Sequence, residues 1–293
     1  MELWLSEAGR SKKLVFSGDL GQYDTPILKD PEPIEEADFV LMESTYGDRR
    51  HRDRSETERE IGEILQGAEH GNVLIPAFAI GRSQELLYML GKHYEAWNLG
   101  RFQIFLDSPM AIEATHIYWD HPRLYDAEAT RLRKDNGGMP LLPNLHQSRD
   151  TEASMAINRI RSGAIIIAGS GMCSGGRIVH HLRHNLPGEE NQVIIVGYQA
   201  RGTLGRRLVG GAESVRIFGE DVPVRARIHT VGGLSAHGDQ DDLARGYEGF
   251  ENRPPVWLVH GEDRAREEFA AYLSRRSGAR VSIPGPGETL ELD

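Results

Sequence analysis

The sequence predicts an α/β protein, because short apolar segments alternate with amphipathic helical segments along its 293 residues. The apolar segments are rich in Val, Ile and Phe, as buried strands are. They are residues 14–16, 39–42, 73–75, 102–106, 164–168, 193–196, 226–229 and 256–259. The helical segments are residues 56–68, 83–96, 151–161, 176–185 and 262–276. We therefore expect helices packed on sheets.

Turn and capping residues predict where several of these elements begin and end. Residues 2–5 alternate like a strand and are expected to pair with residues 14–16 across a turn that contains Gly9. Ser55 and Glu58 have the spacing of a capping box, which predicts that Ser55 caps the first helix. Gly278 is expected to close the last helix.

The chain is long enough for two folded units. Proline-rich and charged segments at residues 29–36 and 47–54 suggest where the chain crosses from one unit to the other. Residues 219–223 suggest the return. The first and last parts of the chain would then belong to one unit.

Composition restricts the classes of function. The net charge of −10 excludes a wholly basic surface that coats nucleic acid, although short arginine clusters allow local contacts or form a solvated polar face. A single cysteine, Cys173, excludes an intrachain disulfide framework and a multi-cysteine zinc site. No apolar run is long enough for a membrane span, and the N-terminus lacks the pattern of a signal peptide. We expect a cytoplasmic protein.

Four side chains that could act in catalysis each follow a predicted strand, where the loops of α/β proteins usually form active sites. Asp19 and Glu43 are carboxylates suited to a metal ligand or a general base, although each could instead cap a helix or close a turn. His237 and His260 each stand beside a glycine, which leaves room for a ligand. A single histidine is more often a packed structural residue, but two in this setting favour a function.

Two other patterns have weaker functional interpretations. His180 and His184 have the spacing of a helical zinc pair, but the glutamate of the HExxH motif is absent, so we expect a packing or solvent-facing role. The glycine-rich segment 169–176 joins a strand to a helix as in dinucleotide-binding proteins. No acidic residue closes the next strand, which argues against a nicotinamide cofactor. The backbone N–H and hydroxyl groups of this segment favour a phosphate site.

Seven motifs, taken in order, resemble the β-CASP branch of the metallo-β-lactamase superfamily. They are Ser17-Gly18-Asp19-Leu20-Gly21, Glu43-Ser44-Thr45-Tyr46-Gly47, Pro76-Ala77-Phe78-Ala79 with Gly81-Arg82 and Gln84-Glu85, Leu106-Asp107-Ser108-Pro109-Met110, residues 169–176, Ser235-Ala236-His237 and Val259-His260-Gly261-Glu262. The resemblance is to the compact bacterial and archaeal ribonucleases of this branch. It implies an αββα metallo-β-lactamase domain of residues 1–47 and 228–293, interrupted by a β-CASP α/β domain of residues 48–227.

The resemblance also implies a role for each matching residue. Asp19 would bridge two zinc ions and count as catalytic, and His260 would ligate one of the ions. Glu43 and His237 would form a catalytic pair near the scissile phosphate, in which Glu43 orients His237. Contacts to phosphate or RNA would come from Ser170, Gly171, Ser174, Gly176 and Arg82. Family branches that act on DNA tend to have Val at the position of His260, so the expected substrate is RNA.

The chain departs from the family pattern in its metal ligands. The family's His-x-His-x-Asp-His motif and one further histidine precede the strand that ends at Asp19, whereas the first histidine here is His51. We therefore expect an N-terminally truncated enzyme whose intact form hydrolyses RNA with zinc. The chain itself, with Asp19 and His260 as its only ligands, would bind zinc weakly, be inactive and dissolve poorly because a sheet edge is exposed.

Two rival functions remain. A non-catalytic RNA-binding β-CASP module would keep the phosphate-binding turn and the arginine clusters without hydrolysis. Hydrolysis of a small substrate is disfavoured, because the family's β-CASP insertion covers a groove for a nucleic-acid strand. The sequence leaves open whether cleavage is endonucleolytic or exonucleolytic, which RNAs are cut, and whether the chain forms a homodimer.

Overall fold

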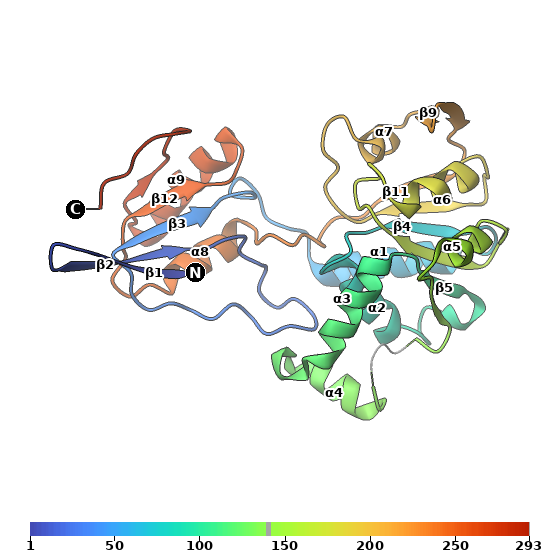
Figure 1. Ribbon diagram of the computed structural model, residues 1–293, viewed down its shortest axis with the longest axis horizontal. Helices are drawn as coiled ribbons and strands as arrows, with labels where there is room; N and C mark the ends of the chain where they lie inside the picture. Colours follow the sequence, from blue (N-terminus) through green and yellow to red (C-terminus); the bar gives the residue numbers. More distant parts are fainter. Residues whose placement is uncertain (139–141, 293) are drawn as a thin grey trace. The chain divides into compact units, whose positions relative to one another are not determined.

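The computed structural model describes residues 1–138 and 142–292 and divides the chain into two compact units (Figure 1). Unit 1 contains Met1–Thr25, Lys29–His51 and the chain from Ser235 onward. Unit 2 contains Pro26–Leu28 and Arg52–Leu234. Unit 1 is therefore assembled from segments near both ends of the chain.

The sheet of unit 1 has five strands in the order β1-β2-β3-β12-β13. The strands are β1 (Glu2–Glu7), β2 (Arg10–Phe16), β3 (Phe39–Glu43), β12 (Val256–Val259) and β13 (Val281–Ser282). β1 pairs with β2 in an antiparallel hairpin, whereas β2, β3, β12 and β13 are parallel. In the register of β3 and β12, Val259 lies opposite Glu43, so the carboxyl ends of these two strands meet at one edge.

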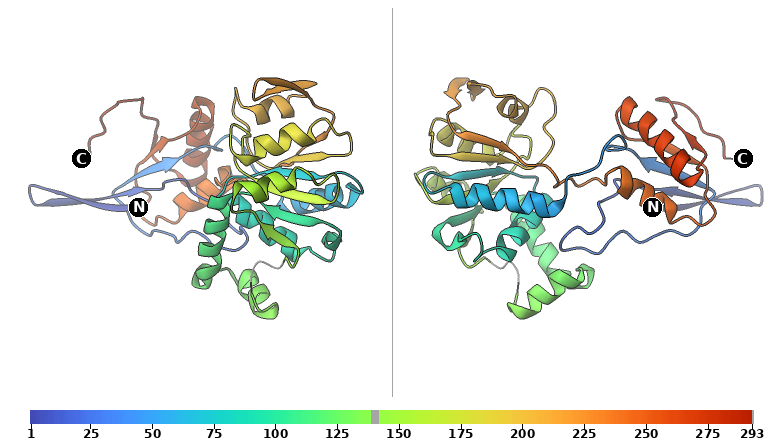
Figure 2. Two further views of the ribbon diagram at one scale, coloured as in Figure 1. Left: turned by 45° about the vertical axis from the view of Figure 1, so that its right-hand side comes forward. Right: turned by 180° about the vertical axis from the view of Figure 1, so that it is seen from behind.

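Two helices pack on this sheet, α8 (Gln240–Glu248) and α9 (Asp263–Ser277), as the views in Figure 2 show. Their apolar residues join those of the strands in one core, which includes Val40, Leu243, Leu258 and Phe269. Burial of this apolar surface provides the main stabilisation of the unit. By contrast, every residue of the edge strand β1 is exposed, including Trp4.

Unit 2 is built on a parallel sheet of six strands in the order β11-β8-β4-β7-β5-β6. The strands are β4 (Val73–Pro76), β5 (Gln103–Leu106), β6 (Leu145–Gln147), β7 (Ala164–Ala168), β8 (Gln192–Ile195) and β11 (Arg227–Thr230). A separate hairpin joins β9 (Ser214–Ile217) and β10 (Glu220–Pro223). In β7, Ile165 and Ile167 enter one apolar cluster and Ile166 enters another. The sheet is therefore buried on both faces, which explains its continuous apolar strand sequences.

The helices of unit 2 alternate with its strands, and α1 precedes the first of them, β4. They are α1 (Arg54–Gly67), α2 (Arg82–Lys92), α3 (Pro109–Asp120), α4 (Ala127–Asp135), α5 (Thr151–Ile157), α6 (Arg177–Asn185) and α7 (Leu204–Val209), with short 3₁₀ helices at Leu99–Arg101 and Pro122–Leu124. Within the described residues, no helix is both long and apolar enough to cross a membrane.

The predicted α/β class, all eight predicted strands and the N-terminal hairpin are confirmed. Four predictions of local structure are wrong. The side chain of Asp53 accepts the hydrogen bond from Ser55 N, so Asp53 caps α1 and Ser55 lies inside the helix. Residues 219–223 close and form the β9–β10 hairpin inside unit 2 instead of leading the chain back to unit 1. The predicted helices 83–96 and 151–161 each end four residues early, at Lys92 and Ile157.

Gly278 at the end of α9 supplies a test of local stability in unit 1. It adopts the left-handed conformation, with φ of 67°, and an added Cβ would meet no atom within 4 Å. We expect Gly278→Ala to lower the free energy of unfolding by about 1 kcal/mol through backbone strain alone. Gly278→Asn should cost less, because asparagine tolerates this conformation. Urea denaturation measures both, and an alanine variant as stable as the asparagine variant would contradict the interpretation.

Candidate active site

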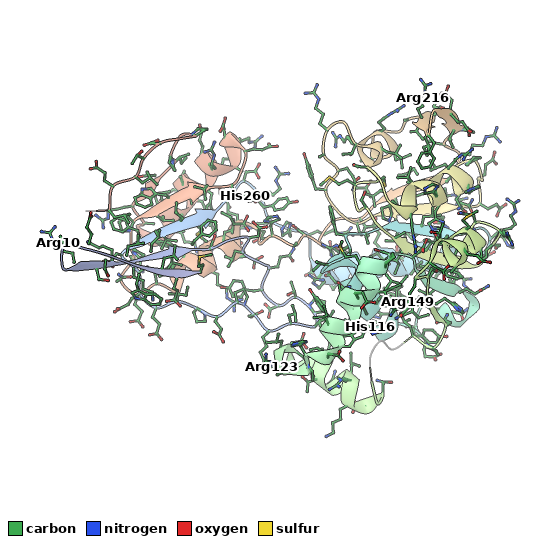
Figure 3. All side chains as sticks on the ribbon, in the orientation of Figure 1. Arg10, His116, Arg123, Arg149, Arg216 and His260 are labelled. Atoms are coloured by element: carbon green, nitrogen blue, oxygen red, sulfur yellow. The ribbon has the colours of Figure 1, made fainter. Side chains whose placement is uncertain are left out.

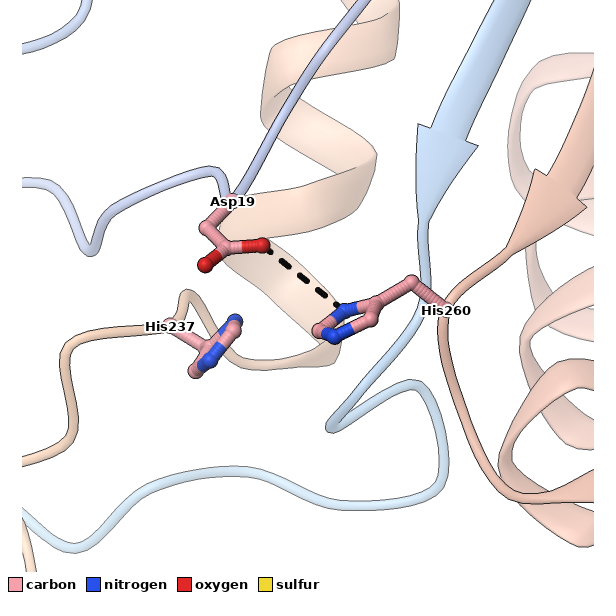
Figure 4. A group of neighbouring side chains, drawn as sticks. All are labelled: Asp19, His237 and His260. Atoms are coloured by element: carbon pink, nitrogen blue, oxygen red, sulfur yellow. Dashed lines mark ion pairs between the residues drawn. The ribbon is translucent and has the colours of Figure 1, made fainter.

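Four of the predicted side chains come together at one edge of the sheet in unit 1. Asp19 follows β2, Glu43 ends β3, and His260 directly follows β12. His237 lies in the loop before α8. Because β2, β3 and β12 are parallel, their carboxyl ends deliver these residues to the same place. In Figure 4 the side chains of Asp19, His237 and His260 point toward one another from three separate loops.

Glu43 is almost fully buried, with its side chain 1% exposed. Both of its carboxylate oxygens lie 3.0 Å from His237 Nδ1. Oε1 also accepts from Leu20 N at 2.6 Å, and Oε2 accepts from Thr45 N at 3.3 Å. These bonds satisfy the buried carboxylate and favour a proton on Nδ1 of His237. The other ring nitrogen, Nε2, is left for a ligand or a substrate.

The same contacts shift the pKa values of both groups. Burial raises the pKa of Glu43, but the hydrogen bonds from His237 and Thr45 outweigh burial and leave the pKa below its ordinary value of 4.5. The hydrogen bond to Glu43 raises the pKa of His237 above its ordinary value of 6.5, against a smaller effect of burial. Each group therefore favours the charged form of the other.

Asp19, His237 and His260 have the arrangement of a metal-binding group. Each offers one ligand atom, and these atoms all lie within 4.8 Å of one another. His260 Nδ1 lies 3.7 Å from Asp19 Oδ1 and 3.1 Å from Thr45 Oγ1. Asp19 and His260 are exposed, so an ion could enter from solvent. Two imidazoles and one carboxylate match the donors that zinc prefers, and three ligands leave a position for water.

The structure thus adds a candidate ligand, because the sequence predicted His237 as a catalytic residue and only Asp19 and His260 as ligands. The contact of His237 with Glu43 is the arrangement in which a carboxylate orients a metal-binding histidine. In residues 1–138 and 142–292 this is the only such group of three or more His, Cys, Asp or Glu side chains. The described residues therefore gather ligands for one ion.

The backbone around His260 is unusually tight. His260 has a φ of 50°, which is uncommon for a residue other than glycine. The next residue is Gly261, where an added Cβ would lie 2.8 Å from Ser44 O and Ser44 Oγ. Ser44 Oγ also donates to Val259 O at 3.0 Å. These contacts fix the loops after β3 and β12 against each other and so hold His260 beside Asp19.

Sequence reasoning missed the residues that hold the loop of His237. His51 Nε2 lies 3.0 Å from His237 O, and His51 N donates to Asp239 Oδ2 at 2.9 Å. Asp239 also caps α8 in a reciprocal capping box with Asp242. The spacing of these two aspartates before an amphipathic helix is a signal that could have identified the cap.

The predicted phosphate-binding residues belong to unit 2, where residues 169–176 form a tight turn before α6. Ser170 Oγ accepts from Ser174 N at 3.0 Å. An added Cβ on Gly171 would lie 2.8 Å from the Phe78 ring, and one on Gly176 would lie 2.4 Å from Gly169 O. Glycine is therefore required at both positions by close packing. Arg82, also predicted to contact RNA, pairs with Glu85 on its own helix, α2.

A buried polar network near this turn was also missed. Asp107 and His181 are fully buried, and His181 Nε2 lies 2.6 Å from Asp107 Oδ2. Arg177 donates to Asp107 Oδ1 at 2.8 Å, and Ser154 donates to Oδ2 at 2.7 Å. These bonds fix the start of α6 to the end of β5. The prediction that His180 and His184 are not a zinc pair stays a prediction.

Comparison with known proteins identifies two domain families in the chain. The family model described as "Beta-Casp domain" matches residues 83–208, and the model described as "Zn-dependent metallo-hydrolase RNA specificity domain" matches residues 221–284. A ribonuclease of Thermus thermophilus is 44% identical over 289 residues, which span 97% of this chain and 65% of that protein. The transcription termination factor FttA of Methanocaldococcus jannaschii is 31% identical over 92% of this chain and 44% of its own length. An RNase J-like protein of the same organism is 28% identical over 96% of this chain and 66% of its own length.

The contact between Glu43 and His237 predicts how the metal-free chain responds to pH. His237 should titrate above 6.5, and Glu43→Gln should bring its pKa down, because the charged partner is lost. The raised pKa of His237 stabilises the folded chain at pH values below 6.5. This stabilisation is lost as the pH rises through the pKa of His237 in the folded chain. The lowered pKa of Glu43 stabilises the folded chain at pH values above 4.5. This stabilisation is lost as the pH falls through the pKa of Glu43 in the folded chain.

Histidine NMR titration in the presence of a chelator measures this effect. His229 in unit 2 is the internal control, because burial lowers its pKa and Glu43 is not among the groups that act on it. A pKa of His237 that does not change in Glu43→Gln would show that the contact is absent in solution.

Proposed function

The chain belongs to the β-CASP branch of the metallo-β-lactamase superfamily, and we propose that it is part of a zinc-dependent enzyme that hydrolyses phosphodiester bonds in RNA. The observation that carries the proposal is the convergence of Asp19, His237 and His260 beside the buried Glu43. Similarity to a Zn-dependent metallo-hydrolase RNA specificity domain and to the Thermus ribonuclease supports metal use and RNA as the substrate. The chain spans less than two thirds of that ribonuclease and under half of FttA.

The side chains of the site suggest a division of labour. Asp19 and His260 are the exposed groups and would hold the ion. A bound divalent ion would supply a polarised phosphoryl oxygen and a water molecule of lowered pKa. His237, whose pKa is raised, would donate a proton from Nε2 to the leaving oxygen or contact the phosphate. Glu43 would orient His237 through Nδ1 and stabilise its charged form.

The ligand count limits what this chain does alone. The described residues offer Asp19 and His260 as ligands of one ion, with His237 as a third ligand only when its Nε2 carries no proton, whereas the family resemblance implies two zinc ions. A second ion would need ligands that residues 1–138 and 142–292 do not bring together. Asp19 and His260 are exposed and His237 is partly exposed, which weakens their hold on an ion. We propose that the chain by itself binds zinc weakly and does not cleave RNA.

Several finer properties are proposals as well. Residues 169–176 and Arg82 are proposed to contact the RNA backbone, supported by the backbone N–H and hydroxyl groups of the turn. A cytoplasmic location is proposed because Cys173 is a free cysteine and is buried. Cleavage within the strand and cleavage from an end both remain open, as does a homodimer.

Zinc content and RNA cleavage test the proposal together. We expect less than one zinc per chain after dialysis, measured by elemental analysis, and no cleavage of a labelled RNA even with added zinc. Asp19→Asn and His260→Ala should each lower the residual zinc further. Asp24→Asn is the matched control, because Asp24 is an exposed aspartate of the same unit outside the ligand group.

Stoichiometric zinc in the unmodified chain would overturn the proposed weak binding. Zinc content that stays the same in the Asp19 and His260 variants would overturn the assignment of the ligands. RNA binding that is strong, salt-sensitive and insensitive to these variants, with no cleavage, would favour the rival non-catalytic RNA-binding module.

A further inference from the structure

Unit 2 contains a cavity of about 640 Å³ that includes none of the residues of the site in unit 1. Its walls come from the turn before α6, from α6 and α7, and from the β9–β10 hairpin. The lining residues that matter for binding are Ser174, Gly176, His180, Arg207, Arg216 and Phe218. A cavity of this volume falls in the size range of small-molecule sites.

Two arginines give the cavity a positive charge. Arg207 on α7 donates to Ser214 O at 3.2 Å, and Arg216 on β9 (Figure 3) donates to Gly219 O at 3.2 Å. Neither guanidinium pairs with a carboxylate in the part of the chain that the structure describes. Asp221 lies opposite Arg216 in the hairpin ladder but forms no ion pair with it. The cavity therefore favours an anionic ligand.

Two other arginines of α6, Arg177 and Arg183, are already paired. Arg183 binds Glu220 through two nitrogens, with distances of 2.6 to 3.1 Å, so the charge of Glu220 is neutralised. The guanidinium of Arg177 donates to Asp107, Ser148 and Arg149 and is occupied there. The free positive charge at the cavity is thus that of Arg207 and Arg216.

An aromatic surface lies beside this charge. Phe218 is 57% exposed although it is a large apolar residue. Its ring centroid lies 4.5 Å from that of His180, at an interplanar angle of 34°. Exposed aromatic rings next to arginines are the combination with which proteins bind single-stranded nucleic acid, since bases stack on the rings and arginines contact the phosphates.

The backbone at Phe218 makes its position unusual. Phe218 and Gly219 form the turn between β9 and β10, with φ values of 50° and 85°. Turns of this kind favour asparagine or glycine at both central positions, and a bulky residue there is strained. Nothing in the packing of the hairpin requires the phenylalanine, because its ring faces solvent and His180. A residue that is locally unfavourable and exposed points to a function.

We propose that this cavity binds one nucleotide of a single-stranded RNA, with its base on Phe218 and His180 and its phosphates at Arg207 and Arg216. The inference rests on the proposed function, which makes RNA the substrate, and it adds a contact for the RNA strand that is separate from the residues of the metal site. A free nucleotide has the same chemistry, so the experiment includes one. The cavity would strengthen RNA binding without taking part in hydrolysis.

Fluorescence anisotropy with a labelled 10-nucleotide oligouridylate and the full chain in a chelator tests this proposal. Phe218→Asn is the central variant, because asparagine suits the turn while the ring is removed. We expect RNA affinity to fall by roughly tenfold and thermal stability to be kept or raised. Phe218→Tyr, which keeps a ring, should retain most of the affinity.

A double variant, Arg207→Gln with Arg216→Gln, tests whether the positive charge of the cavity contributes to RNA binding. This double variant should bind more weakly and reduce the slope of log affinity against log salt by about 1.4, as expected for two lost phosphate contacts to a single strand. Arg206→Gln is the matched control, because it removes the same charge from the adjacent exposed position on α7, outside the cavity lining. An effect of Arg206→Gln equal to that of Arg207→Gln alone would overturn the site.

Three further outcomes would reject the proposal. The first is an RNA affinity that is unchanged in Phe218→Asn and in the double arginine variant. The second is that the unmodified chain does not bind the oligonucleotide. The third is that uridine monophosphate competes with an affinity equal to that of the oligonucleotide, which would indicate a free nucleotide as the ligand. Binding measured in the chelator depends neither on zinc nor on cleavage. Zinc content and RNA cleavage test the proposed function, whereas RNA affinity in the chelator tests this cavity. A failure of one proposal is therefore distinguishable from a failure of the other.

Discussion

The hydrogen bonds between Glu43 and His237 join residues 194 positions apart and bring the two ends of the chain into one unit. The parallel pairing of β3 with β12, with Val259 opposite Glu43, brings His260 to the same edge of the sheet. A charge without partners at 1% exposure would be costly, and His237, Leu20 N and Thr45 N together satisfy the buried carboxylate. Asp19 and His260 take their places around this pair, and the candidate metal site depends on it.

Much of the fold follows from local features of the sequence. Runs such as residues 164–168 are continuously apolar because both faces of the sheet are buried, and this pattern predicts the strands well. Asp19, Glu43, His237 and His260 could also be selected in advance, because each lies next to a predicted strand and matches a family motif. That they meet at one edge follows from the parallel pairing, which the structure supplies.

What the sequence could not predict depends on contacts between distant residues or on competition between neighbours. Ser55 has the spacing of a cap, but Asp53 two residues earlier accepts its N–H and caps α1 instead. His181 looks like one of several helical histidines, and only the position of Asp107, 74 residues away, makes it a buried partner. His237 as a candidate metal ligand likewise required the geometry of Asp19 and His260 around it.

The parallel pairing of β3 with β12 also sets an order of events during synthesis. β3 ends at Glu43 and β12 begins at Val256, so the strand that completes the centre of the sheet is translated after all of unit 2. Closing so long a loop is slow and entropically costly, whereas the contacts within unit 2 lie closer along the chain. We therefore expect unit 2 to fold before β12 and β13, the last strands of unit 1, are synthesised. The contact between Glu43 and His237 is among the last parts of the molecule to form.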